Sequence, residues 1–230
     1  KTGSIMFKLQ GEDHSKKSLK FFEEIGVEHE IWDLEKLKER MPIYSHDQYD
    51  GTTRPDDDEH FFDKTGKKIE GAVFTPGSGY VSDPQLSSHN LQVAAEANGG
   101  EFLFNNEIKE IRQEDGKVLG VSLKNGEQID APIVVNVAGP HSFVINRMAG
   151  VEEEMNIKTK ALRHEVHHVP SPEGFDFEKD GFHTSDGDNY IYFRPETGNT
   201  ILIGSEDPLC DPKEWIEDPD NYNNQVTESQ

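Results

Sequence analysis

Hydrophobic and polar residues alternate along this chain with two different periods. Helical periods, each beginning at an aspartate that can cap a helix and ending at glycine or proline, cover residues 13–26, 33–42 and 83–100. Apolar or alternating runs predict strands at residues 2–9, 71–75 and 101–104, and four more strands between 106 and 139. The third helix is expected to pack through Leu86 and Leu91, and residues 45–70 read as a polar loop. The pattern predicts helices packed on a sheet.

The segment 133–142, IVVNVAGPHS, has the composition of a strand that is buried on both faces. Its apolar run is interrupted only by Asn136, and it stops at Ala138, Gly139 and Pro140, which remove side chains from the end of the strand. Ligands of open α/β sheets bind where strands end. We therefore expect a ligand to approach this backbone closely.

The C-terminal part of the chain has strand-like runs without helices between them. These runs lie at residues 158–169, 181–185, 189–196 and 199–206, with a hairpin turn at 197–199. Strands that follow one another in this way predict an antiparallel sheet, a layer of a different type from the middle of the chain. The expected fold class is therefore α/β (α+β), with two domains interleaved in sequence.

Composition and charge narrow the possible partners. The 230 residues carry a formal charge of −22, from 45 acidic and 23 basic residues, and no basic patch interrupts it. Such a surface repels nucleic-acid phosphates and anionic membranes, so neither is expected as a partner. Cys210 is the single cysteine, which excludes an intramolecular disulfide and fits a reducing compartment. With no apolar stretch near the ~20 residues of a membrane span, a cytoplasmic location is expected.

Two sequence motifs offer chemistry that their context does not support. GSGYVS, at 77–82, resembles a phosphate-binding glycine loop, but Ser82 replaces the third glycine and Asp83 would repel a phosphate. We interpret it as a turn. HEVHH, at 164–168, matches the zinc motif HExxH, which requires a helix. Valines and Pro170 favour a strand here, in which His164 and His168 would lie about 13 Å apart.

Three stretches taken in order resemble the FAD-dependent amine and amino-acid oxidoreductases, the family of D-amino-acid oxidase, glycine oxidase, and sarcosine and dimethylglycine dehydrogenases. They are GAVFTPGSGYVSDPQL, EIKEIRQEDGKVLGVSLKNGEQIDAPIVVNVAGPHS and YIYFRPETGNTILIGSEDP. The resemblance implies a partial Rossmann-like FAD-binding domain with a β-meander, and an antiparallel-sheet substrate domain that roofs the flavin. It implies residues 71–150 for the FAD-binding part, with 1–70 (including the connecting loop) and 151–230 for the substrate domain.

The same resemblance assigns site residues. Ala138, Gly139 and Pro140 would lie against FAD, and Ile108 would contact its adenine through the backbone. His141 stands where the family often has an aromatic residue near the cofactor, and it is assigned to substrate binding.

Two residues of the proposed roof strand are candidates for substrate binding. Tyr192 and Arg194 alternate with apolar residues and so share one face. Arg194 would hold a substrate carboxylate and Tyr192 would line the pocket, unless both simply belong to a solvated strand face. The substrate expected is a small amine or amino acid, in particular an N-methylated amino acid such as sarcosine or dimethylglycine, whose C–N bond is oxidised by hydride transfer to the flavin.

The chain departs from the family at its ends. The family's N-terminal GxGxxG unit is absent, and the segment that completes the flavin site is expected beyond Gln230. We therefore expect a central fragment of a larger enzyme that alone binds FAD poorly and is inactive. One alternative is a glycerol-phosphate-like dehydrogenase, but this chain has no basic cluster to bind the phosphate. The others are a zinc hydrolase using His164, Glu165 and His168, and a cofactor-free binding module of the same fold.

Overall fold

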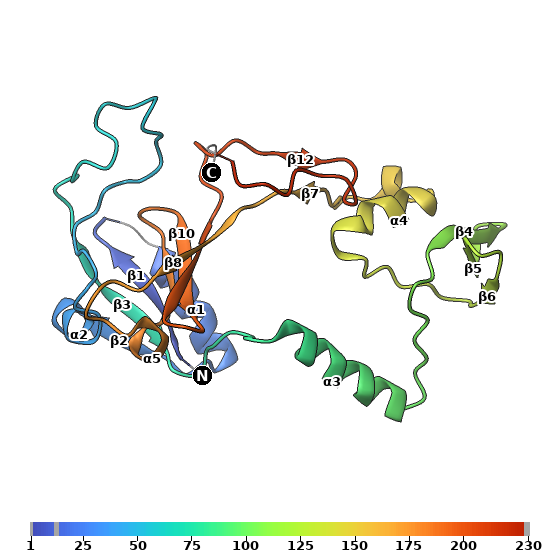
Figure 1. The fold of residues 1–230 in the computed structure, drawn as a ribbon, viewed down its shortest axis with the longest axis horizontal. Coiled ribbons are helices and arrows are strands. Elements are labelled where there is room, and N and C mark those ends of the chain that lie inside the picture. The colour runs from blue at the N-terminus through green and yellow to red at the C-terminus, as the bar shows by residue number, and fades with distance from the viewer. Residues whose placement is uncertain (1, 12–13, 228–230) are drawn as a thin grey trace. The chain divides into compact units, whose positions relative to one another are not determined.

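The computed structural model describes residues 2–11 and 14–227, which fall into two compact units drawn in Figure 1. The first unit takes in residues 1–82, 164–212 and 226–230, and the second takes in 83–163 and 213–225. The two units interleave in sequence. Asp13, the expected cap of the first helix, lies outside the described residues.

A seven-stranded mixed sheet forms the first unit, in the order β2-β3-β1-β9-β10-β11-β8. Its strands are β1 Ser4–Leu9, β2 Glu30–Asp33, β3 Ile69–Thr75, β8 Val166–Pro170, β9 His183–Asp186, β10 Ile191–Glu196 and β11 Thr200–Ser205. Helices α1 His14–Ile25, α2 Leu34–Arg40 and α5 Phe177–Asp180 accompany them. All neighbouring strands are antiparallel except β1 and β9, which run parallel. The sequence predicted antiparallel pairing and did not indicate this one parallel pair.

The core of the first unit covers one face of the sheet. Opposite residues of neighbouring strands share a face, and the residues of this face are buried, among them Ile5, Phe74, Thr184 and Ile201. Helix α2 packs on it through Leu37, whose side chain is fully buried. Every second residue of these strands points to the opposite face, which carries the candidate site described below.

Local sequence signals set the ends of several elements. The Asp33 carboxylate accepts a hydrogen bond from the Lys36 amide at 2.8 Å and so caps α2, as the sequence predicted. The β10–β11 hairpin turns at Gly198 and Asn199, both with positive φ (86° and 54°), a conformation that glycine and asparagine tolerate best. The structure confirms these predicted caps and turns. The sequence predicts them because each depends on neighbouring residues alone.

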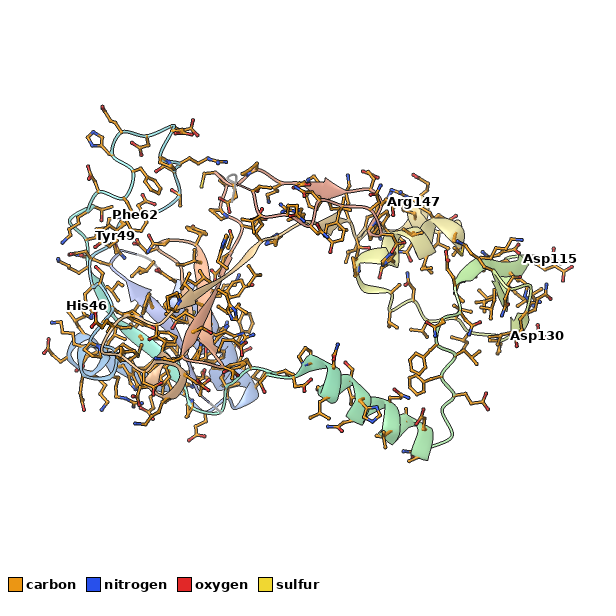
Figure 2. All side chains as sticks on the ribbon, viewed as in Figure 1. His46, Tyr49, Phe62, Asp115, Asp130 and Arg147 are labelled. Carbon is orange, nitrogen blue, oxygen red and sulfur yellow. The ribbon has the colours of Figure 1, made fainter. Side chains whose placement is uncertain are left out.

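The second unit contains a three-stranded antiparallel meander, β4 Ile108–Glu114, β5 Lys117–Leu123 and β6 Gln128–Asp130, as predicted. Its other elements are α3 Pro84–Ala97, η1 Gly139–His141, α4 Ser142–Met148, η2 Glu152–Glu154, β7 Ala161–Leu162 and β12 Trp215–Ile216. Asp115 lies at the β4–β5 turn and Asp130 at the end of β6 (Figure 2). The Asp83 carboxylate caps α3 by accepting from the Leu86 amide at 2.8 Å, again as predicted.

Two predicted strands of the second unit are wrong. Residues 101–104 and 133–138 form no strand, and in the latter the alternate residues Ile133, Val135 and Val137 are 76%, 73% and 86% exposed. A buried strand needs a hydrogen-bonded neighbour on at least one edge, and none of the described strands pairs with these segments. Helix α3 is likewise without a buried residue, so Leu86 and Leu91 do not pack as expected.

The proposed boundary between residues 70 and 71 cuts through β3, which belongs to the first unit. Assignment of either unit to FAD or substrate binding stays a prediction. Among residues 2–11 and 14–227, no helix combines the length and the apolar character needed to span a membrane.

Candidate functional site

The face of the sheet opposite the core brings Tyr192 and Arg194 together with polar residues from β9. Tyr192 of β10 lies directly opposite Ser185 of β9 and Gly204 of β11. Arg194 follows two residues later, and His183 precedes Ser185 by two, so the alternation of strands places them on the same face. A hydroxyl, a phenol, an imidazole and a guanidinium thus share one surface.

The guanidinium of Arg194 is fixed by three neighbours. It lies 4.3 Å from the centre of the Tyr80 ring, a cation–π arrangement, and its Nη1 donates to Glu196 Oε2 at 2.7 Å and to the Pro195 carbonyl at 3.1 Å. Within the described part of the chain, its Nε and Nη2 donors have no protein partner. This edge of the guanidinium remains available to an anion.

His183 lies on the same face, and its surroundings disfavour the charged imidazole. Its Nδ1 lies 3.4 Å from the hydroxyl of Ser4, on the parallel neighbour strand β1. Burial, and then the positive charge of Arg194, lower the pKa of His183, while Glu206 acts in the opposite direction. The positive charge of this surface therefore comes from Arg194 and not from the imidazole.

Gly204 makes room for the Tyr192 ring. A Cβ at this position would lie 2.7 Å from Cε1 of Tyr192 and still closer to the hydroxyl end of the ring. The phenol therefore extends across β11 over the glycine backbone. Sequence reasoning did not single out Gly204, although a glycine inside a strand signals a close approach of this kind.

A cavity of about 380 Å³ opens beside this surface. Ser185 and Glu206 line it from the sheet, and the Ser185 hydroxyl donates to Glu206 Oε1 at 2.7 Å. The start of α1 contributes Ser15, Lys17 and Ser18. The apolar residues Met6, Phe7 and Leu9 complete its lining. The volume is in the range of small-molecule sites.

A larger cavity, of about 490 Å³, lies on the core side of the sheet. Ile203 and His167 line it, and they share their face with Phe193 of the core, while Phe61 and Phe62 cover it from the loop. Phe62 stacks on Tyr49 at 4.9 Å (Figure 2). Neither cavity is lined by Tyr192 or Arg194. We place the candidate site on the open face of the sheet that carries these two residues.

His141 and the residues predicted to contact FAD all belong to the second unit. The Glu107 carbonyl accepts a hydrogen bond from the Lys124 amide, so the backbone groups of Glu107 face the β5 side. Backbone groups alternate along a strand, so those of Ile108 point to the outer edge of β4, which no described strand covers. A Cβ on Gly139 would meet no atom within 4 Å. Both backbones are thus accessible to a cofactor. His141 Nε2 lies 3.0 Å from Asp220 Oδ1.

The HEVHH segment does not form a zinc site. Residues Val166–Pro170 are a strand, as predicted, and Glu165 receives hydrogen bonds from the amide and hydroxyl of Thr227. No group of three or more potential ligand side chains in the described residues is arranged to hold a metal ion. The helical geometry that the zinc alternative needs is therefore absent.

Comparison with known proteins identifies the family. A family model described as "FAD dependent oxidoreductase" matches residues 1–229. The chain belongs to the FAD-dependent oxidoreductases. This confirms the resemblance inferred from the sequence, the mixed α/β fold and FAD as the family's cofactor. No curated protein matches the chain.

Solved structures of several dehydrogenases and oxidases share the fold at low sequence identity. L-proline dehydrogenase from P. horikoshii has a TM-score of 0.62 at 21% identity, covering 89% of this chain and 48% of its own. Glycine oxidase from Bacillus cereus ATCC 14579 has 0.61 at 20%, covering 99% and 51%. A modified fructosyl peptide oxidase from Aspergillus nidulans has 0.58 at 17%, covering 95% and 50%. The chain spans about half the length of these proteins.

Proposed function

We propose that this chain is the central part of a flavoenzyme that oxidises the C–N bond of an amino acid or an N-methylated amino acid such as sarcosine or dimethylglycine. The observation that carries the proposal is the free donor edge of Arg194 on the same open face as Tyr192. A guanidinium edge pairs side-on with a carboxylate through two parallel hydrogen bonds. An amine without a carboxylate would make no such pair with the guanidinium edge.

The residues of this face are proposed to have different roles in substrate binding. Arg194 holds the carboxylate and so orients the neighbouring carbon and nitrogen. Tyr192 lines the pocket beside it, with Gly204 leaving the room that the ring needs. Burial and the positive charge of Arg194 lower the pKa of His183, which disfavours a second positive charge beside a substrate amine.

Bound FAD supplies the hydride acceptor for this oxidation. If the amine binds in its neutral form, its lone pair assists departure of the hydride from the adjacent carbon, and no side chain is required as a base. Loss of this hydride would leave the substrate with a C=N bond, as an iminium. We therefore assign no catalytic base in this chain.

Four residues of the second unit are proposed to hold FAD. The outer backbone edge of Ile108 suits the adenine, and the absence of large side chains at Ala138, Gly139 and Pro140 suits close passage of the cofactor. His141 is proposed near the substrate end of the cofactor. The support is the accessibility of both backbones, together with family membership.

We also propose that the exposed apolar residues of the second unit are covered by other parts of the complete protein. Support comes from the exposure of Ile133, Val135 and Val137 and from the half-length coverage of the matched proteins. Exposed apolar positions of this kind mark a missing packing partner. The 230-residue chain alone is then expected to bind FAD poorly and to be inactive.

The experiment is a substrate screen on the complete protein loaded with FAD. Sarcosine, dimethylglycine and glycine are mixed with it without oxygen, and loss of the visible absorption of oxidised flavin is followed. Reduction by at least one amino acid, and none by glycerol 3-phosphate, is the expected result. Failure to bind FAD at all would contradict the proposal and favour a cofactor-free binding module.

A further inference from the structure

Glu196 determines which part of Arg194 can reach a ligand. The two side chains lie on the same face of β10, and both are largely buried, at 18% and 17% side-chain exposure. Glu196 Oε2 takes a hydrogen bond from Nη1, while its Oε1 accepts from the Thr197 amide at 2.9 Å. The carboxylate is thus held by the hairpin turn and holds Arg194 in turn.

Tyr80 restricts the same guanidinium from a second direction. Its ring lies against the guanidinium plane at 4.3 Å, so rotation about the end of the Arg194 side chain would break the stacking as well as the ion pair. The side chain carries a large rotational entropy when free, which binding of a ligand would otherwise have to remove. Here Glu196 and Tyr80 restrict that freedom before any ligand arrives.

We propose that Glu196 is a positioning residue that selects a single carboxylate at Arg194 over a phosphate. This inference rests on the proposed function, in which Arg194 binds the substrate carboxylate. With Nη1 engaged, the Nε and Nη2 donors offer one planar edge that matches one carboxylate. The negative charge of Glu196, 2.7 Å from Nη1, offsets the positive charge of Arg194 and repels a dianion such as phosphate more strongly than a monoanion.

The test compares Glu196→Gln with the unchanged protein, using the complete FAD-loaded protein. Glutamine keeps an oxygen acceptor for the Thr197 amide, so the turn is retained, but it loses the charge that pairs with Arg194. Glu173→Gln, at an exposed glutamate, is the matched control for removing one negative charge. Dissociation constants of acetate and of inorganic phosphate are measured from the change they cause in the flavin spectrum, and KM and kcat from the amino-acid substrate.

Loss of positioning and loss of negative charge have opposite effects on the affinity for acetate. If Glu196 positions Arg194, its replacement by glutamine weakens acetate binding about three- to tenfold, because Arg194 must then be ordered on binding. KM rises by the same factor at unchanged kcat, and phosphate binds more tightly. Glu196→Asp, which keeps the charge on a shorter side chain, recovers part of the acetate affinity. Glu173→Gln changes none of these quantities.

Two results would overturn the inference in different ways. If Glu196→Gln tightens or leaves unchanged the binding of both anions while Arg194→Lys weakens acetate, Glu196 does not position the guanidinium, and the proposed function stands. If Arg194→Lys leaves acetate binding and KM unchanged, the carboxylate is not bound at Arg194. The proposed substrate site and the role of Glu196 then both fail.

Discussion

The placement of Tyr192 over Gly204 predicts a specific energetic coupling between these two residues. In Gly204→Ala, the new Cβ would lie 2.7 Å from Cε1 of Tyr192, whereas carbon atoms are at their best separation near 3.5–4.0 Å, so the ring has to move by about 1 Å. Overpacking of this kind costs about 1–3 kcal/mol. The backbone at Gly204 is not in the left-handed region, so alanine otherwise gains about 0.5–1 kcal/mol over glycine in a strand.

The net effect of Gly204→Ala therefore depends on Tyr192. With the tyrosine present, we expect a loss of about 0.5–2 kcal/mol in the free energy of unfolding, and in the Tyr192→Ala background a gain of about 0.5–1 kcal/mol. A double-mutant cycle then gives a coupling energy of about 1–3 kcal/mol. Urea unfolding of the four proteins at one fixed FAD concentration measures it.

Equal costs of Gly204→Ala in both backgrounds would refute the reasoning. In that case the ring does not lie over Gly204, and Tyr192 would not be held on the face that we assign to the substrate. Unchanged urea slopes across the four proteins are the control that the comparison concerns stability and not a change in the unfolded state.

Three further predictions concern the first unit. Phe177→Ala should lower the free energy of unfolding by about 3–5 kcal/mol because the ring is 1% exposed, whereas Phe21→Ala, at a ring 51% exposed, should change it by less than about 1 kcal/mol, both measured by urea unfolding. Burial raises the pKa of Asp188 above its ordinary value of 3.8, so the folded state keeps this proton at pH values where the unfolded chain has lost it. The carboxyl therefore makes the free energy of unfolding fall as pH rises from 3.8 through the raised pKa, and Asp188→Asn should make this fall smaller, as measured by urea unfolding at a series of pH values. The Lys64 ammonium helps to lower the pKa of Asp47 to about 2, and in Lys64→Ala a carboxyl NMR titration should show it rising towards 3.8.

Local signals in the sequence were sufficient for caps, turns and shared strand faces. Asp33, Asp83 and the turn at Asn199 act on backbone groups within three residues, and the alternation that places Tyr192 beside Arg194 is a property of one strand. Such features follow from neighbouring residues whatever the rest of the chain does. They were therefore predicted correctly.

Features that depend on distant parts of the chain were missed or wrong. Tyr80, within a segment interpreted only as a turn, stacks on Arg194 through tertiary packing that no local pattern encodes. The run from Ile133 to Val137 has the composition of a buried strand, but composition does not supply the neighbouring strand that would pair with it. The parallel contact of β1 with β9 likewise joins segments far apart in sequence.

The central claim, that Arg194 receives the substrate carboxylate, is tested most directly by comparing sarcosine with dimethylamine, which lacks only the carboxylate. Rates of anaerobic flavin reduction by both are measured in the complete protein and in Arg194→Gln. We predict that the unchanged protein strongly prefers sarcosine and that Arg194→Gln loses this preference by slowing sarcosine alone. An equal preference for sarcosine in both proteins would contradict the account.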